Sequence, residues 1–253
     1  GDHGQGDAGH DAPLGGIQNG GCLFQIGVHV LENTAKTIRD MGGFRCVSLE
    51  ETLEIAHRFS EAYATERFNQ LDSERIAYLF RRNMQELDMV VQDLWLELKE
   101  SLFEPQGFEV KFGGDDALPP IPIPNGSINA ILRGFVDRVD TWQTQGNTYY
   151  RVVDYKTGRK EFDYCDVFNG VGLQMLLYLF ALRDSDSDMF QNKAIPAGVQ
   201  YFPARVPILS VEGELTDDEV QAERQKLWKR SGLILSDDDI LRAMDDSEEA
   251  VRL

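Results

Sequence analysis

Several features are scarce in this chain of 253 residues, and each scarcity excludes a class of protein. Its three cysteines, Cys22, Cys46 and Cys165, are too few and too widely spaced for a disulfide framework or a four-cysteine metal site, and are expected to be small buried side chains. No apolar run approaches the roughly 20 residues that a membrane helix needs. The first ten residues lack the basic and apolar regions of a secretory signal. We therefore expect a cytoplasmic protein that has no membrane partner.

Basic residues are scarce as well. The chain has 25 Lys and Arg against 43 Asp and Glu, a net charge of −18, which excludes non-specific binding of nucleic acid over the whole surface. The charge is uneven, however. Residues 131–160 hold six basic and three acidic residues, a balance of +3, whereas residues 212–249 hold five and thirteen, a balance of −8. A local basic groove is therefore compatible with the composition.

The chain does have enough apolar residues for a core, with 42% hydrophobic and 10% aromatic. Residues 1–20 are rich in Gly and Asp and are expected to form a flexible tail. Residues 21–105 predict a helical part, with a short helix over 21–33, a second from Ser48 and a longer one after Ser73. Ser48 and Glu51 fit a capping box, in which each side chain bonds a free backbone N–H at the helix start.

From Pro105 onward the pattern predicts strands and helices in alternation. Strands are expected near 108–112 and over 127–140, 149–155 and 197–202, helices over 166–182 and 216–230, and a proline-rich loop over 118–124. This order indicates an α/β or α+β core over residues 106–253, behind the helical part and within the same domain. No glycine-rich loop is followed by Lys and Ser or Thr, so ATP binding is not expected.

Three charged residues fall on two of the predicted strands. Asp137 and Asp154 are expected on neighbouring antiparallel strands, and Lys156 shares a face with Asp154 because alternate strand residues point to the same side. Carboxylate oxygens suit Mg²⁺ or Mn²⁺, and a lysine beside such an ion can hold a water or a phosphate. An ordinary cross-strand ion pair between Asp137 and Lys156 explains the spacing equally well.

Three motifs carry a resemblance to a known family: Gly134-Phe-Val-Asp-Arg-Val-Asp140, Val152-Val-Asp-Tyr-Lys-Thr-Gly158 and Gln174-Met-Leu-Leu-Tyr178. They resemble the RecB-like branch of the PD-(D/E)XK nuclease superfamily. Stretches around 164–178, 194–202 and 229–245 are most similar to the nuclease domains in the B subunits of bacterial AddAB-type helicase–nucleases. The resemblance covers roughly residues 20–247 and implies a restriction-endonuclease-like fold, with a mixed central sheet flanked by helices.

The resemblance also implies roles for individual residues. Asp137, Asp154 and the Tyr155 carbonyl would hold Mg²⁺ or Mn²⁺, and Lys156 would be the catalytic lysine. Gln174 and Tyr178 would support the site or contact the DNA strand. The residues implied to contact DNA are Arg138, Arg159 and Lys160. Glu109 would be an acid behind the metal ligands or an exposed strand residue.

The sequence departs from the family pattern in two ways. The family has a metal-binding His in its first motif, where Gln25 stands here and would offer the metal a neutral carbonyl oxygen, with lower affinity; His29, one turn later, is either a substitute or a structural residue. The family also carries four cysteines for an iron–sulfur cluster, and none of the three cysteines here matches them.

The implied function is Mg²⁺-dependent hydrolysis of single-stranded DNA within a complex that contains an AddA-type helicase–nuclease subunit, in double-strand break repair and recombination. Two alternatives stay open. One is a catalytically weakened DNA-binding or assembly module, because of Gln25 and the missing cysteines. The other is an acidic protein-interaction domain that binds no nucleic acid.

Overall fold

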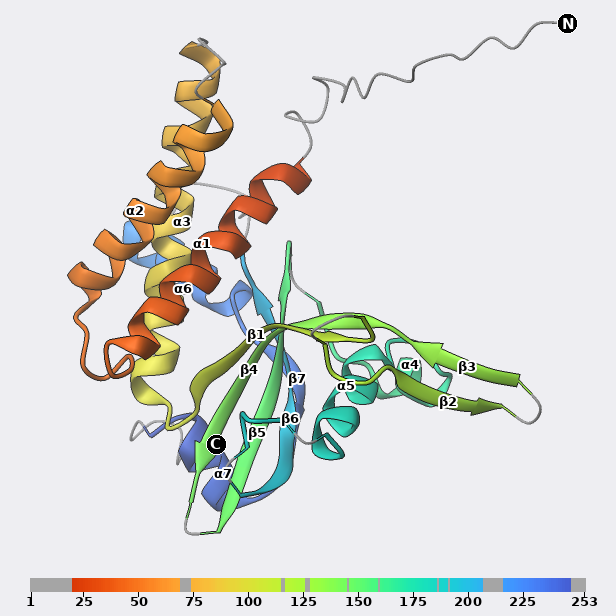
Figure 1. Cartoon of the computed structure of the whole chain (residues 1–253). Helices are drawn as coiled ribbons and strands as arrows, with labels where there is room; N and C mark the ends of the chain where they lie inside the picture. The colour runs from red at the N-terminus through yellow and green to blue at the C-terminus, as the bar shows by residue number, and fades with distance from the viewer. Residues whose placement is uncertain are drawn as a thin grey trace, which may run out of the picture.

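The structure is a computed structural model that describes residues 20–68, 74–114, 117–125, 128–144, 146–158, 160–185, 187–190, 192–206 and 216–246. The predicted tail up to residue 19 lies outside this range. Figure 1 shows a helical part at one side of a central sheet, a hairpin that projects from the sheet, and a helix against the opposite face. The predicted fold class is confirmed: a mixed sheet is flanked by helices, with three helices at the N-terminal side.

Three helices form the N-terminal part: α1 (Gly20–Asp40), α2 (Leu49–Phe68) and α3 (Glu74–Glu100). Helix α1 is longer than predicted, because Ala35 and Ile38 continue its buried face beyond residue 33. The capping box that starts α2 is confirmed: Ser48 N donates to Glu51 Oε2 at 2.9 Å, and Glu51 N donates to Ser48 Oγ at 3.2 Å.

The central sheet has five strands in the order β1-β4-β5-β6-β7. They are β1 (Glu104–Phe112), β4 (Gly134–Gln143), β5 (Asn147–Lys156), β6 (Lys193–Pro203) and β7 (Ser231–Ile234). The predicted antiparallel meander is β1, β4 and β5. Strand β6 runs parallel to β5, and β7 is antiparallel to β6. The β5-to-β6 crossover carries two helices, as a parallel connection requires.

Two predicted elements are wrong in their boundaries. The expected strand over 127–140 is two strands, β3 (Ile128–Leu132) and β4, which are separated by Arg133. Strand β3 pairs with β2 (Ile121–Asn125), most of which falls within the predicted proline-rich loop. The expected helix over 166–182 is likewise divided into α4 (Tyr164–Phe168) and α5 (Gln174–Arg183). Gly170 and Gly172, with φ of +80° and +72°, break it, because residues other than glycine rarely adopt these angles.

The sheet has a separate core on each face. Helices α1 to α3 pack against Val153, Tyr155 and Phe202, whereas α5 packs against Val152, Val199 and other apolar strand residues on the opposite face. Two short elements complete the chain: α6 (Asp217–Leu227), which starts at the predicted Thr216–Glu219 capping box, and α7 (Asp238–Met244), which packs its Ile240 on Phe103 and Ala197. None of the helices in the described ranges has the length and apolar character that a membrane span requires.

Candidate active site

The sheet opens between β4 and β5 at one end. Registered pairs of these strands run from Gln143 opposite Thr148 to Arg138 opposite Val153. Beyond that point β4 continues beside β1, and β5 continues beside β6 as far as Lys156. We call this opening the fork. It brings Asp137, Asp154 and Lys156 together at neighbouring strand ends, in agreement with the sequence.

Asp137 spans the fork with its side chain. Its Oδ2 accepts a hydrogen bond from the backbone N–H of Tyr155 at 2.7 Å, where a strand partner would otherwise be. Lys156 forms an ion pair with Asp154 on its own strand, so the simple Asp137–Lys156 pair is not the contact found. The side chains of Asp154 and Lys156 remain 22% and 33% exposed, which leaves them accessible to a substrate.

Two further carboxylates adjoin Asp137. Glu32 of α1 is only 5% exposed, and burial, helped by the charges of Glu109 and Asp137, raises its pKa to about 8. Glu109 lies on β1 between residues that pair with Arg138 and Val136, opposite Asp137, and its φ of +46° is unusual for a residue with a side chain. We call Glu32, Glu109, Asp137 and Asp154 the carboxylate cluster.

The cluster carries more negative charge than it can neutralise. Burial raises the pKa of Asp137 to about 6; the Tyr155 N–H and Lys156 oppose this rise, while Asp154 and Glu109 add to it. Perturbed carboxyl groups that adjoin one another in an accessible position are typical of functional sites. Glu32 was not predicted as a site residue. An acid between the apolar residues Leu31 and Ala35, both of which are buried, is the signal that could have indicated it.

Gln174 and Tyr178 support the start of β4. Gln174 Nε2 donates to Tyr178 Oη at 2.8 Å, so the two side chains lie on one face of α5. Tyr178 is only 1% exposed and stacks on Phe112 at 5.1 Å between ring centroids, a position that favours a supporting role over contact with DNA. A Cβ at Gly134 would lie 1.8 Å from Tyr178 Oη; the first residue of the Gly-x-x-Asp motif therefore makes room for this hydroxyl.

The donors predicted on α1 differ in their distance from the cluster. Gln25 and His29 are both exposed. Gln25 lies seven residues before Glu32, about 10 Å along the helix axis, whereas His29 lies one turn before it. The His29 ring also contacts the Tyr63 ring at 5.4 Å. His29 is therefore closer than Gln25 to Glu32 along the axis of α1.

The oxygen donors at the fork fit a hard divalent cation in their chemistry. Within the described ranges, however, no three His, Cys, Asp or Glu side chains converge on one point at metal-binding distance, so further ligands would have to come from carbonyl or water oxygens. Cys46 and Cys165 are exposed, contrary to the expectation of buried side chains, and the Cys22 side chain lies outside the described residues. That this chain lacks the cysteines of the family's iron–sulfur cluster stays an expectation from the sequence.

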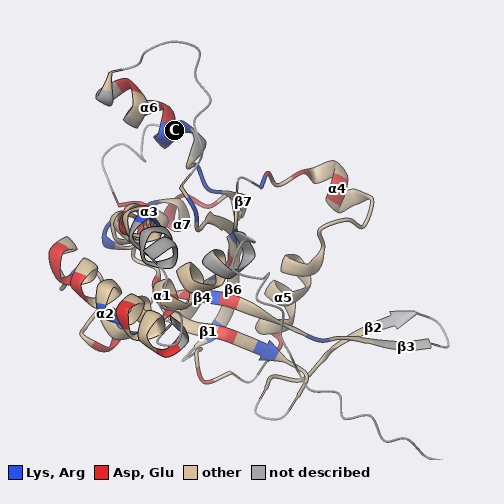
Figure 2. Ribbon diagram, turned by 90° about the horizontal axis from the view of Figure 1, so that it is seen from above, with Lys and Arg blue, Asp and Glu red and all other residues tan. Residues whose placement is uncertain are grey.

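The three residues predicted to contact DNA differ in their exposure. Lys160 is exposed, with Nζ 4.6 Å from the centroid of the Tyr201 ring, and Arg159 lies outside the described residues. Arg138 is completely buried, so its position gives it no access to a phosphate. Arg151, counted in the basic segment, is buried too, and the surface patch is smaller than the sequence suggests. Figure 2 shows acidic residues spread along α2.

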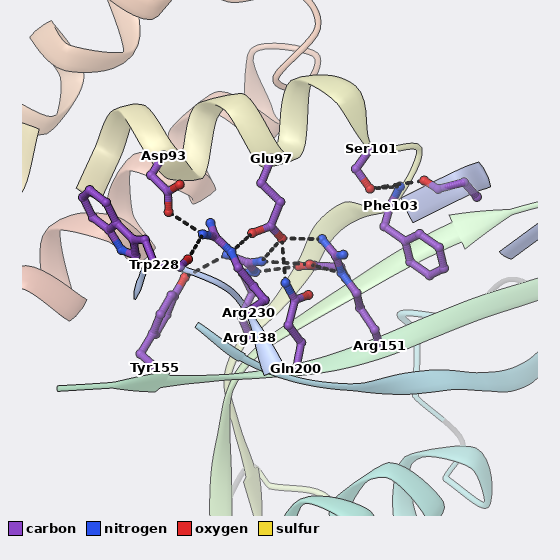
Figure 3. A network of polar contacts seen from close by, with 12 residues as sticks. Asp93, Glu97, Ser101, Phe103, Arg138, Arg151, Tyr155, Gln200, Trp228 and Arg230 are labelled. Carbon is purple, nitrogen blue, oxygen red and sulfur yellow. Dashed lines mark hydrogen bonds and ion pairs between the residues drawn. The ribbon is translucent and has the colours of Figure 1, made fainter. Parts of the chain in front are cut away.

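Arg138 belongs instead to a set of six buried or partly buried charges that we call the arginine network (Figure 3). Arg138 binds Asp140 through two hydrogen bonds of 2.7 and 3.0 Å. Glu97 of α3 accepts from Arg151 and from Arg230, both at 2.8 Å. The full set is Asp93, Glu97, Arg138, Asp140, Arg151 and Arg230.

A mixed sheet forked around two aspartates and a lysine, with α1 over one face and α5 over the other, defines a nuclease core of the PD-(D/E)XK type. The chain belongs to the PD-(D/E)XK nuclease superfamily, which it matches over residues 33–250.

Among relatives, the B subunit of the ATP-dependent helicase/deoxyribonuclease of Clostridium novyi is 33% identical over 225 residues, 86% of this chain and 20% of the relative. The protein of the same name from Clostridium acetobutylicum is 36% identical over 174 residues, 68% of this chain and 15% of the relative. That from Thermoanaerobacter sp. strain X514 is 40% identical over 178 residues, 69% and 15%. The chain thus spans about a fifth or less of the length of these relatives.

Proposed function

We propose that this chain is the nuclease domain of an AddAB-type helicase–nuclease and hydrolyses phosphodiester bonds of single-stranded DNA with Mg²⁺ or Mn²⁺. The observation that carries the proposal is the fork: Asp137, Asp154 and Lys156 meet beside two further acids, Glu32 and Glu109. Membership of the nuclease superfamily and similarity to deoxyribonuclease subunits support it.

Each residue at the fork has a role in this proposal. Asp137 and Asp154 would hold the ion, with the Tyr155 carbonyl as a further donor. A bound divalent cation supplies a water of lowered pKa and polarises the scissile phosphate. Lys156 positions that water or a phosphate oxygen, because its ammonium is held beside Asp154 and is partly exposed. Gln174 and Tyr178 position the strand that carries Asp137.

Helix α1 completes the site in the same proposal. Glu32 lies next to Asp137 and is the acid that a cation would ionise, since its pKa is raised to about 8 without one. His29 is favoured over Gln25 as the side chain that assists it, because it lies one turn from Glu32. We expect His29→Ala to raise the Mg²⁺ concentration needed for half-maximal cleavage and Gln25→Ala to leave it unchanged. Equal effects of the two substitutions would reject this assignment.

The test is cleavage of single-stranded DNA with and without Mg²⁺ by the protein, by Asp154→Asn and by Asp184→Asn. Asp184 is an exposed acid at the end of α5 and serves as the control. We expect Asp154→Asn to lower the rate by about a thousandfold, because several kcal/mol of charge stabilisation is lost. Equal cleavage by Asp154→Asn and the unmodified protein, or no effect of Mg²⁺, would contradict the proposal.

A DNA-binding or assembly module is the second candidate, and the absence of a converged three-ligand metal site among the described residues favours it. Calorimetric titration separates the two: heat on Mg²⁺ addition, lost in Asp154→Asn, supports the nuclease, whereas salt-dependent DNA binding without metal binding supports the module. Partnership with an AddA-type subunit, a role in double-strand break repair and a cytoplasmic location are part of the same proposal.

A further inference from the structure

Two contacts cross the fork beyond the last registered strand pair, and both end on Tyr155. Asp137 Oδ2 accepts from the Tyr155 N–H at 2.7 Å, and Arg138 Nη1 donates to Tyr155 Oη at 3.2 Å. The Arg138 guanidinium carbon also lies 5.7 Å from the centroid of the Tyr155 ring. Two neighbouring residues of β4 therefore bind the backbone and the side chain of the one β5 residue between Asp154 and Lys156.

The Arg138 guanidinium is itself fixed by two acids. Asp140 binds its guanidinium at two atoms, and Glu97 of α3 lies 3.5 Å from Nη2. Glu97 is fixed in turn by Arg151 and Arg230 (Figure 3). The hydroxyl of Tyr155 is therefore linked through Arg138 to Glu97 of helix α3, an element that is not one of the two strands of the fork.

This link between β4 and β5 lies where acidic side chains repel one another. The Asp137 carboxylate reaches the N–H of the residue that follows Asp154, so two like charges meet at the opening, and their repulsion favours a wider fork. A buried ionic network is often no more stabilising than apolar residues of the same volume, whereas it can fix one geometry. The Arg138 guanidinium, which holds the Tyr155 hydroxyl across the opening, suits the role of fixing one geometry.

We propose that Arg138 and Tyr155 form a clamp across the fork that sets the separation of Asp137 and Asp154. Both side chains have a positioning role: the Arg138 guanidinium and the Tyr155 hydroxyl act through the two aspartates and touch no substrate. The clamp concerns the geometry of the protein without ligands, and its effect on metal binding rests on the proposed nuclease function.

The test compares Tyr155→Phe with Tyr150→Phe in the 253-residue chain. Tyr150 is a matched control, because it is a buried tyrosine of the same strand whose hydroxyl donates a hydrogen bond, to the Leu179 carbonyl at 2.5 Å on the other face. Each substitution removes one buried hydroxyl and its bond, so a loss of stability alone affects both variants similarly.

Two quantities are measured in all three proteins: hydrogen exchange of the amides of residues 154–156 without metal, and the Mn²⁺ concentration for half-saturation, followed by calorimetry. In Tyr155→Phe we expect exchange to accelerate by about fivefold or more, because the fork opens locally. We expect the half-saturating Mn²⁺ concentration to rise by about tenfold, as for other losses of support to metal ligands. Tyr150→Phe should match the unmodified protein in both.

The outcomes separate the clamp from the proposed function. If the two variants exchange equally, the clamp is overturned even when the protein binds Mn²⁺ and cuts DNA. If Tyr155→Phe exchanges faster but its half-saturating Mn²⁺ concentration is unchanged, the claim that the clamp sets the aspartate separation is overturned. If exchange accelerates selectively and the unmodified protein neither binds Mn²⁺ nor cuts DNA, the clamp stands and the nuclease proposal fails.

Discussion

The arginine network and the carboxylate cluster lie within a few residues of each other on β4 and β5, yet one buried acid in each, Glu97 and Glu32, behaves in the opposite way to the other. Burial raises the pKa of Glu97, but Arg230, Arg151 and Arg138 together lower it to about 2. Burial also raises the pKa of Glu32, and there the neighbouring Glu109 and Asp137 raise it further, to about 8, against one opposing lysine, Lys36. Burial is common to both acids, so the partners decide the direction.

The balance of charge explains the difference. The network has three arginines for three acids, and its members bind one another at 2.6–3.5 Å. The cluster has four acids, with Lys156 paired to Asp154. A matched set of charges holds elements together, whereas an unmatched set binds protons or cations.

The largest expected effect comes from breaking the balance of the network. Glu97→Gln leaves Arg138, Arg151 and Arg230 with an unpaired buried charge and should lower the free energy of unfolding by about 3–5 kcal/mol. Urea denaturation measures this change. Glu100→Gln, an exposed acid on the same helix, is the control and should change stability by less than about 0.5 kcal/mol. A loss for Glu97→Gln no larger than this control would remove the distinction between the two regions.

Removing an acid from the cluster should have the opposite sign. Between about pH 4.5 and 8, folded Glu32 keeps a proton that the unfolded chain has lost, so the contribution of Glu32 to stability falls as pH rises. Glu32→Gln does not titrate. Without metal it should match the unmodified protein at pH 4.5 and exceed its unfolding free energy by about 4 kcal/mol at pH 8, since the pKa of Glu32 rises from 4.5 to about 8 and one pKa unit corresponds to about 1.4 kcal/mol. Thermal and urea unfolding at several pH values test this, and a parallel pH dependence of both proteins would disprove it.

A divalent cation should neutralise the cluster and leave the network unaffected. We expect Mn²⁺ at a hundred times its dissociation constant to stabilise the protein by about 2–3 kcal/mol. At one fixed Mn²⁺ concentration the effect should be larger at pH 8 than at pH 6, because the ion must displace protons from Glu32 and Asp137, whose pKa values are raised to about 8 and 6. Differential scanning calorimetry measures the shift. Asp154→Asn should abolish it, whereas Asp184→Asn should retain it.

The two regions also differ in how far the sequence predicts them. Asp137, Asp154 and Lys156 follow from local rules, because strand alternation and neighbouring strands bring them to one end of the sheet. Glu32 lies about a hundred residues earlier in an apolar helix, and only the packing of α1 over β1 reveals its role. Arg138 was predicted to contact DNA from its charge alone. Adjacent residues of a strand point to opposite faces of the sheet, so Arg138 does not share the face of its neighbour Asp137.

The element boundaries show a similar limit. The capping boxes at Ser48 and Thr216 were predictable because both partners lie within three residues. The division of the strand over 127–140 depends on β3 pairing with β2 rather than with the central sheet, a tertiary choice that no local pattern contains. The break between α4 and α5 did have a local signal in Gly170 and Gly172.

The smallest expected effect concerns how β4 is positioned before it reaches the cluster. Gly134→Ala places a methyl group where Tyr178 Oη lies, 1.8 Å from the new Cβ, and the stacked, buried Tyr178 ring has little room to move. We expect a loss of about 1–2 kcal/mol, typical of overpacking, and a displaced Asp137 that lowers cleavage more than stability. Removing the hydroxyl with Tyr178→Phe in the same chain should relieve much of the clash, because the next ring atom is 3.0 Å away. A double-mutant cycle on unfolding free energy and cleavage rate measures the coupling. Additive losses would show that the hydroxyl and the glycine act independently, whereas recovery of cleavage in the double variant would establish that the Gly-x-x-Asp motif and the Gln-x-x-x-Tyr helix form one support for the fork.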